Sequence, residues 1–206
     1  MVQEALKIPT TVAELEEFGA ELRIAASFDE YLEWVDRCEF NIEYFNNEIT
    51  IMGNASYYHE KLVMLIGIAL SKILPSKYNI LGSNIKIHVP DLRSPDNFNA
   101  DVSVVEGEPE FMVLSSGKTS EGTILNPKIV VEVTSKRTIS HDFGDKLLAY
   151  KKIATLQQVI FVSQYQNAVS VYERKGPNHW DLHDYYNLTD SFTVLGNSLT
   201  LQDIYQ

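Results

Sequence analysis

The sequence predicts an α/β (α+β) fold with a mixed central sheet, and two observations support this. Helical and strand patterns alternate along the chain in the order helix, hairpin, helix, several strands, helix and further strands. Such an order is typical of domains in which helices cover a central sheet. A chain of 206 residues, 45% of them hydrophobic, is also long enough to bury one substantial core. We therefore expect one domain with small appendages.

The first part of the chain predicts helices and a hairpin. The predicted elements are helices at 10–22 and 27–35, hairpin strands at 39–43 and 48–52, and a largely buried helix at 57–74. A threonine or serine followed by acidic residues begins each of the first two helices, which is a typical capping pattern. Asn46 and Asn47 favour the hairpin turn, because asparagine tolerates the left-handed backbone conformation. Pro75 cannot continue the long helix and ends it.

The rest of the chain predicts a sheet with one more helix. Strand patterns occur at 78–81, 85–89, 101–105, 128–134, 158–162, 168–173 and 180–186, and a helical pattern occurs near 140–153. Residues 90–99 have the composition of a loop. Residues 106–126 also read as a loop, which is unusually long for a compact domain and therefore a candidate functional segment.

The longest apolar run argues against a membrane protein. It covers Leu62 to Leu70, about half of what a membrane-spanning helix needs. The first residues show no export signal, and the single cysteine, Cys38, cannot form an internal disulfide. We expect a cytoplasmic protein without a membrane partner.

The charge distribution is unusual for a protein that binds nucleic acid. The formal net charge is −11, and residues 1–50 hold 12 acidic against 3 basic residues. Residues 118–152 hold 7 basic against 4 acidic residues, so basic side chains could line one groove there. Binding to nucleic acid would then be modest and sensitive to salt.

Two acidic residues on predicted strands are the first candidates for chemistry. Glu132 interrupts the apolar run Ile-Val-Val-Glu-Val-Thr, where an unpaired carboxylate would cost several kcal/mol. The period of two places Glu132 on one face with Thr134, and Asp101 shares a face with Ser103 on another strand. If these strands are neighbours, the carboxylates can hold a cation, and oxygen ligands select magnesium or manganese. The alternative is that each is a structural carboxylate at the end of a strand.

The helix near 140–153 supplies a positive charge. Asp142, Lys146 and Tyr150 are four residues apart and form one polar stripe. The ammonium group could polarise a water and stabilise a phosphorane. The alternative is a solvated ion pair between Asp142 and Lys146.

Other residues carry weaker signals. His59-Glu60 lacks the second histidine of a metalloprotease helix, because Val63 stands in its place. His59 is better interpreted as a hydrogen-bonding histidine than as a metal ligand. Five tyrosines could stack on bases, although core packing would explain them equally well: Tyr57, Tyr58, Tyr185, Tyr186 and Tyr205.

The order and spacing of these residues resemble a family of putative restriction endonucleases that is greatly expanded in cyanobacteria, within the PD-(D/E)XK nuclease superfamily. The resemblance covers residues 27–190. The residues that carry it are Ile42 to Phe45 with Glu48-Ile49, His59, Asp101 to Val105, Val131 to Ser135 with Thr138, and Asp142, Lys146 and Tyr150.

The resemblance implies a restriction-endonuclease-like core at 27–206, with an N-terminal helical extension at 1–26. It implies that Asp101, Glu132 and the backbone carbonyl of Val133 hold Mg²⁺ or Mn²⁺. Glu43 would enter from the hairpin, and Lys146 would be the catalytic lysine. Four further residues would contact these groups without binding the metal themselves: His59, Thr134, Asp142 and Tyr150.

Three residues depart from the family pattern. Ala100 replaces the proline before Asp101, and Asn47 replaces the glycine of the hairpin turn. Thr134 stands where the superfamily lysine would follow Glu132 by two residues, so catalysis depends on Lys146, with Lys136 as a fallback. We expect an endonuclease that hydrolyses DNA with a metal-activated water, and a homodimer is the expected assembly. The rival is a nuclease-fold module that binds DNA or another partner without useful catalysis.

Overall fold

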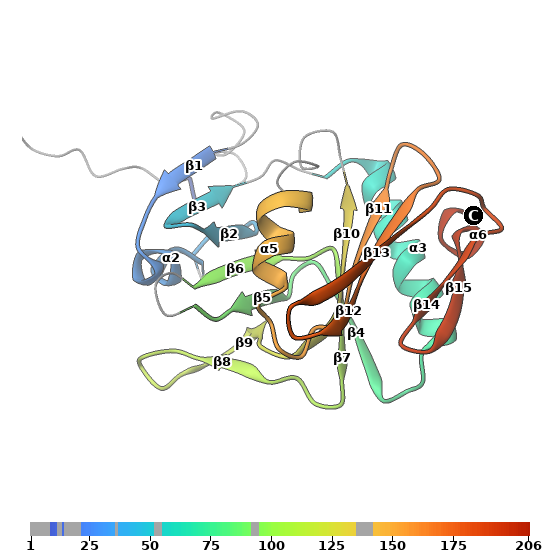
Figure 1. Cartoon of the computed structure of the whole chain (residues 1–206). Helices are drawn as coiled ribbons and strands as arrows, with labels where there is room; N and C mark the ends of the chain where they lie inside the picture. The colour runs from blue at the N-terminus through green and yellow to red at the C-terminus, as the bar shows by residue number, and fades with distance from the viewer. Residues whose placement is uncertain are drawn as a thin grey trace, which may run out of the picture.

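The structure is a computed structural model that describes residues 9–11, 14, 22–35, 37–51, 55–91, 95–134 and 142–206. Its strands form two large sheets and a small one (Figure 1). Sheet A has the order β1 (Leu22–Ala25), β3 (Glu48–Ile51), β2 (Ile42–Phe45), β6 (Asp96–Asn99), β5 (Lys86–Val89), β9 (Thr119–Ile124), β8 (Phe111–Val113). Sheet B has the order β13 (His179–Tyr185), β12 (Val169–Gly176), β11 (Gln158–Ser163), β10 (Pro127–Thr134), β7 (Val102–Glu106), β4 (Tyr78–Gly82). The third sheet pairs β14 (Ser191–Val194) with β15 (Asn197–Thr200).

Sheet B is mixed, as the sequence predicts. Its central strand β10 runs parallel to β11 and antiparallel to β7. Within the described ranges, five helical segments accompany the sheets: α2 (Phe28–Val35), α3 (Tyr57–Ile73), η1 (a π-helix, Asp142–Lys146), α5 (Leu147–Tyr150) and α6 (Leu201–Tyr205). The predicted α/β class with a mixed sheet and flanking helices is therefore confirmed.

The two faces of β10 contribute to different cores because side chains alternate along a strand. Ile129, Val131 and Val133 pack into a core that also contains residues of α3, α6, β14 and β15. Val130 packs on the other side, into a core formed with α5 and with strands β5, β6 and β9 of sheet A. Sheet B thus lies between α3 on one face and α5 with sheet A on the other, so Glu132 faces α5 and sheet A.

Local sequence signals explain the elements that carry site residues. Asn46 and Asn47 have φ of 52° and 62°, so both adopt the left-handed conformation that the hairpin between β2 and β3 requires. The hydroxyl of Ser56 accepts a hydrogen bond from the backbone N–H of His59, which caps α3. Ser27 and Glu30 form a reciprocal cap at the beginning of α2.

Several expectations differ from the structure. The segments 90–99 and 106–126 are not simply loops, because they contain β6, β8 and β9. Strands β6 and β9 are rich in polar residues, so hydrophobic alternation does not reveal them, and β8 has only three residues. All three form through pairing, because β5 pairs with both β6 and β9, and β8 pairs with β9.

The helix predicted near 140–153 is also different. It consists of the π-helix η1 followed by the single turn α5. Short π segments are frequent at functional sites.

The chain from 1 to 26 is not wholly a helical extension. Leu22–Ala25 form β1, which pairs antiparallel with β3 and so belongs to sheet A. Most of the predicted helix at 10–22 lies outside the described residues.

In the described part of the chain, no helix has the length and apolar character that crossing a membrane would require.

Candidate functional site

Glu132 lies at the centre of the molecule, where β10 faces α5. Only 4% of its surface is exposed. Tyr150 of α5, which is fully buried, donates a hydrogen bond of 2.7 Å from its hydroxyl to Oε1 of Glu132. Glu132 is therefore a buried carboxylate that has partners, as its position in an apolar run requires.

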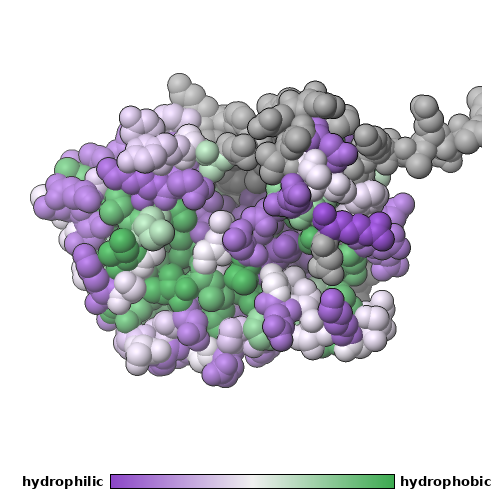
Figure 2. All heavy atoms as spheres, turned by 180° about the vertical axis from the view of Figure 1, so that it is seen from behind, coloured by the Kyte–Doolittle hydropathy of each residue, from purple (hydrophilic) through white to green (hydrophobic). Residues whose placement is uncertain are grey.

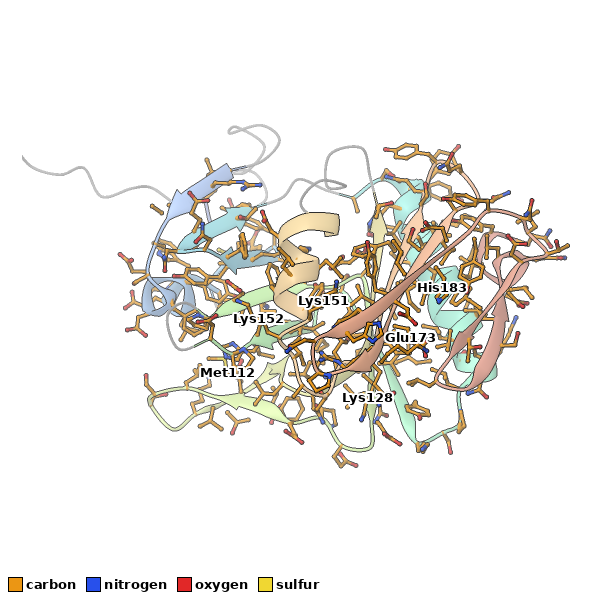
Figure 3. All side chains as sticks on the ribbon, in the orientation of Figure 1. Met112, Lys128, Lys151, Lys152, Glu173 and His183 are labelled. Carbon is orange, nitrogen blue, oxygen red and sulfur yellow. The ribbon has the colours of Figure 1, made fainter. Side chains whose placement is uncertain are left out.

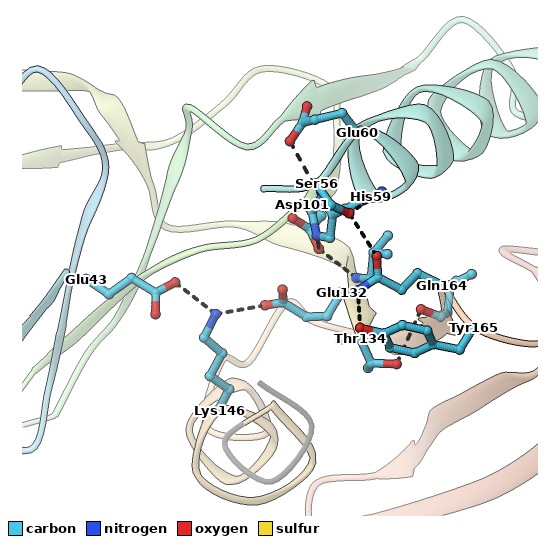
Figure 4. Close-up of polar contacts among 12 residues, drawn as sticks. Glu43, Ser56, His59, Glu60, Asp101, Glu132, Thr134, Lys146, Gln164 and Tyr165 are labelled. Atoms are coloured by element: carbon cyan, nitrogen blue, oxygen red, sulfur yellow. Dashed lines mark hydrogen bonds and ion pairs between the residues drawn. The ribbon is translucent and has the colours of Figure 1, made fainter. Parts of the chain in front are cut away.

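Lys146 connects two carboxylates from different sheets. Its Nζ lies 2.8 Å from Oε1 of Glu43 and 3.5 Å from Oε1 of Glu132, and all three side chains are at most 5% exposed (Figure 4). The Nζ also lies 5.6 Å from the ring centre of Phe98, a favourable position for a cation. The alternative of a solvated lysine is therefore wrong.

Glu43 reaches the site from the hairpin, as the family resemblance implies. It lies on β2, and its Oε1 also accepts a hydrogen bond of 3.0 Å from the backbone N–H of Asn99 on β6. The N–H of Asn99 therefore fixes Glu43 while Lys146 neutralises it. Sequence reasoning missed Asn99, which lies in a segment that it interpreted as a loop.

Asp101 forms a second group of contacts beside the first. Its Oδ2 accepts a hydrogen bond of 2.6 Å from the backbone N–H of Val133, the residue after Glu132. The Nε2 of His59 lies 3.4 Å from the same oxygen. Asp101 thus contacts the backbone next to Glu132, and β7, which follows Asp101, is a neighbour of β10, as expected from the sequence.

His59 is held as a hydrogen-bonding partner of Asp101. Burial alone lowers the pKa of His59, but the hydrogen bond and charge of Asp101, together with Glu60, outweigh burial and raise this pKa above its ordinary value. His59 therefore orients Asp101, in agreement with its interpretation as a hydrogen-bonding histidine.

The other residues that were expected to support the site differ in what they contact. Tyr150 contacts Glu132 directly. The hydroxyl of Thr134 donates a hydrogen bond of 3.4 Å to the carbonyl of Val162 on β11, so this contact joins two strands of sheet B. The side chain of Asp142 lies outside the described part of the structure, and so does Lys136.

Several buried polar atoms without a hydrogen-bond partner belong to this region. Among the described residues, these atoms are Glu43 Oε2, His59 Nδ1, Asn99 Oδ1 and Ser103 Oγ. Glu43 and His59 belong to the site, and Asn99 contacts Glu43. Since buried polar groups normally have partners, these atoms mark a place where water, an ion or a substrate could supply them.

The donor chemistry fits magnesium. Asp101, Glu132 and Glu43 offer carboxylate oxygens, and the partnerless Oε2 of Glu43 is an available acceptor. No group of three or more acidic, histidine or cysteine side chains close enough to hold a metal ion occurs among the described residues. Carboxylate oxygens are the ligands that magnesium prefers in proteins.

The basic residues of 118–152 do not gather into one groove within the described structure. Lys128 pairs with Glu106 at 3.6 Å, and Lys152 pairs with Asp91 at 3.0 Å. Lys151 lies over the rings of Tyr172 and Trp180, and burial lowers its pKa. Lys151 and Lys152 lie near the end of α5, apart from Lys128 (Figure 3).

Comparisons with known proteins agree on the fold. The crystal structure of a putative nuclease belonging to DUF820 from Anabaena variabilis superposes with a TM-score of 0.64 and 15% sequence identity. The match covers 87% of this chain and 97% of that one, so the chain has the fold of this protein.

Two relatives from Synechocystis resemble the sequence. The uncharacterized protein sll1609 is 27% identical over 156 residues, which are 73% of this chain and 82% of the relative. The uncharacterized protein slr1290 is 27% identical over 163 residues, which are 76% of this chain and 78% of the relative.

The family comparison covers most of the chain. The model of the Uma2 family, described as "Putative restriction endonuclease", matches residues 28–202. This match includes Glu43, Asp101, Glu132 and Lys146, and it agrees with the family that the sequence motifs resemble. The chain therefore belongs to the Uma2 family of putative restriction endonucleases.

Proposed function

We propose that the protein is a metal-dependent endonuclease that hydrolyses phosphodiester bonds of DNA. The observation that carries this proposal is the buried cluster of Glu43, Lys146 and Glu132, placed beside Asp101 on a nuclease fold. Burying a lysine with two carboxylates is costly, and three separate elements, β2, β10 and η1, contribute these side chains. A buried cluster of charged side chains from separate parts of the chain is a candidate functional site.

In the proposed site, Asp101, Glu132 and the carbonyl of Val133 would hold Mg²⁺ or Mn²⁺. The ion, when bound, would supply Lewis-acid stabilisation of the negative charge that develops on the phosphate. Glu43 would add a carboxylate from the hairpin side.

The protein groups have separate tasks in the proposed reaction. A water oxygen forms a bond to phosphorus while the bond from phosphorus to the opposite ester oxygen breaks, and that oxygen leaves with a proton. Lys146 supplies positive charge for the transition state, and Glu43 and Glu132 hold its ammonium group in place. Tyr150 fixes Glu132, and His59 with the N–H of Val133 fixes Asp101.

Two measurements test the proposal. Isothermal titration with Mn²⁺ should show binding that Asp101→Ala and Glu132→Ala remove. Nicking of supercoiled plasmid with Mg²⁺ or Mn²⁺ should fall about 100-fold or more in Lys146→Met, because that charge acts mainly in the transition state. Lys152→Met, whose lysine is half-exposed and pairs with Asp91, is the matched control and should nick at the wild-type rate. Metal binding that persists in both acidic variants would reject the metal site.

A second candidate function is a nuclease-fold module that binds DNA without cleaving it. The ion pairs of Lys146 favour this non-cleaving module. The Lys146 side chain is only 2% exposed, and both of its partners are carboxylates. Wild-type protein that binds DNA but nicks none with either metal would support this module and reject the endonuclease.

The proposal includes a homodimer formed through α3. Glu60, Met64, Ile68 and Lys72 are four residues apart and exposed, so they form one ridge of the helix. Hydrophobic residues gather on the half of the molecule that carries α3 (Figure 2). A two-fold antiparallel pairing would place Met64 against Ile68 of the partner subunit and Glu60 beside Lys72 of the partner subunit. The ridge is thus complementary to itself, as a two-fold interface requires.

A charge exchange tests the homodimer by sedimentation equilibrium. Glu60→Lys should shift the protein to monomer, and adding Lys72→Glu should restore the dimer. Val113→Lys is the control. It introduces a lysine at an exposed apolar residue of β8, outside the ridge, and should leave the dimer intact. A wild-type protein that stays monomeric at about 100 times the concentration of a typical assay would reject the pairing.

A further inference from the structure

Three exposed tyrosines lie near the candidate site. Tyr57, Tyr58 and Tyr165 are 74%, 72% and 59% exposed. Tyr57 and Tyr58 begin α3, and their ring centres are 5.5 Å apart in an edge-to-face arrangement. Tyr185 and Tyr205, by contrast, pack partly against the core, so the structure separates tyrosines that the sequence cannot distinguish.

Polar contacts join the beginning of α3 to Tyr165 and to the end of β10. The hydroxyl of Ser56, just before Tyr57, donates a hydrogen bond of 3.2 Å to Gln164, whose amide donates one of 3.2 Å to the hydroxyl of Tyr165 (Figure 4). The backbone N–H of Gln164 donates to the carbonyl of Thr134 at the end of β10. On the helix, Tyr58 is followed by His59, which contacts Asp101. Tyr57, Tyr58 and Tyr165, called here the tyrosine platform, therefore border the Asp101 side of the site.

The charge of the protein makes a duplex backbone a poor primary target. Its net charge is −11, and Lys128, Lys151 and Lys152 are engaged with carboxylates or rings and do not line one groove. Affinity for duplex DNA comes largely from neutralised phosphates, so the described basic side chains offer little of it. Aromatic rings bind bases by stacking, which requires bases that are not already stacked inside a duplex.

We propose that the preferred substrate is DNA with unpaired bases, and that these bases stack on the tyrosine platform beside Asp101. This inference rests on the nuclease function proposed above, and it adds the substrate class. Single-stranded segments and frayed or flapped ends present such bases, whereas intact duplex does not.

Fluorescence anisotropy with a labelled oligothymidylate and a labelled hairpin duplex of equal length tests the proposal in metal-free buffer. The wild type should bind the oligothymidylate more tightly than the duplex. Tyr57→Ser and Tyr165→Ser should each weaken single-strand binding by about tenfold, the order of magnitude that stacking of one base contributes. Tyr57→Phe keeps the ring and should stay within about twofold of the wild type. Tyr186→Ser changes a tyrosine that is 61% exposed beyond the end of β13, and it is the matched control.

Equal binding of duplex and single strand, or serine variants that bind like the control, would overturn the proposal. A nicking assay with Mn²⁺ separates this failure from failure of the nuclease function. Cleavage of intact duplex that the tyrosine variants do not alter would leave the nuclease and reject the platform. Single-strand binding that depends on Tyr57 and Tyr165, in a protein that cleaves nothing, would support the platform and reject the nuclease.

Discussion

Lys146 is a buried lysine that depends on two carboxylate partners. Its side chain is 2% exposed, and its charge is compensated by Glu43 and Glu132. Removing one partner of a buried ion pair leaves an uncompensated charge and typically costs about 3–5 kcal/mol. A variant of Lys146 therefore changes stability as well as chemistry, and its activity has to be measured where it is folded.

We predict that Lys146→Met lowers the free energy of unfolding by about 3–5 kcal/mol. Adding Glu43→Gln should recover part of this loss, because one uncompensated carboxylate is then neutral. Urea denaturation of the wild type, both single variants and the double variant measures the coupling. Lys152→Met should change stability by less than about 0.5 kcal/mol, as is usual for a surface site. Strict additivity of the two substitutions would mean that Glu43 and Lys146 do not act as a pair.

At the scale of elements, the hairpin of β2 and β3 positions Glu43. Its turn depends on Asn46 and Asn47, both in the left-handed region. The carboxylate that the hairpin presents also holds the N–H of Asn99 on β6. The conformation of this turn and the position of Glu43 in the site therefore depend on the same short hairpin.

We predict that Asn47→Val destabilises the protein by about 1–2 kcal/mol, because a β-branched residue is strained at a φ of 62°. Asn47→Gly should change stability by less than about 1 kcal/mol, since glycine adopts positive φ readily but loses the contact from the Tyr44 hydroxyl. Urea denaturation measures both variants, and hydrogen exchange at the Asn99 amide reports on the hairpin. Equal stabilities of the two variants would show that the turn is not strained in this way.

At the scale of the molecule, Tyr205 fastens the C-terminal helix α6 to sheet B. Its hydroxyl lies 2.9 Å from the carbonyl oxygens of Ser163 and Ala168, at the connection between β11 and β12. Burial raises the pKa of Tyr205 to about 12, although hydrogen bonds to the backbone of Ala168 and Ser163 oppose it. The folded protein thus favours the neutral phenol.

This raised pKa predicts a loss of stability in alkali. The contribution of Tyr205 is fully present below pH 10, the ordinary pKa of tyrosine, and is lost as pH rises from about 10 to 12. Two pKa units correspond to about 3 kcal/mol at most, and partial exposure reduces the expected effect to about 1–2 kcal/mol. The difference in free energy of unfolding between the wild type and Tyr205→Phe should therefore narrow over this range. A constant difference from pH 8 to 12 would contradict the assignment.

Some features of the whole molecule follow from the sequence alone. Alternation of side chains determined β10 and its two faces, and a carboxylate inside an apolar run marked Glu132 as a residue that needs a partner. Asparagines predicted the hairpin turn, and Pro75 predicted the end of the long helix. These signals are local, because each depends on residues a few positions apart.

Only the tertiary structure decided the rest. Glu43 and Lys146 are 103 residues apart and meet because sheet A packs against α5, a contact that no local pattern encodes. Strands β6 and β9 are polar and form through their pairing with β5, so hydrophobic alternation could not reveal them. The burial of Lys146 and the exposure of Tyr57 were likewise decided by long-range packing, since the same residue types occur both in cores and on surfaces.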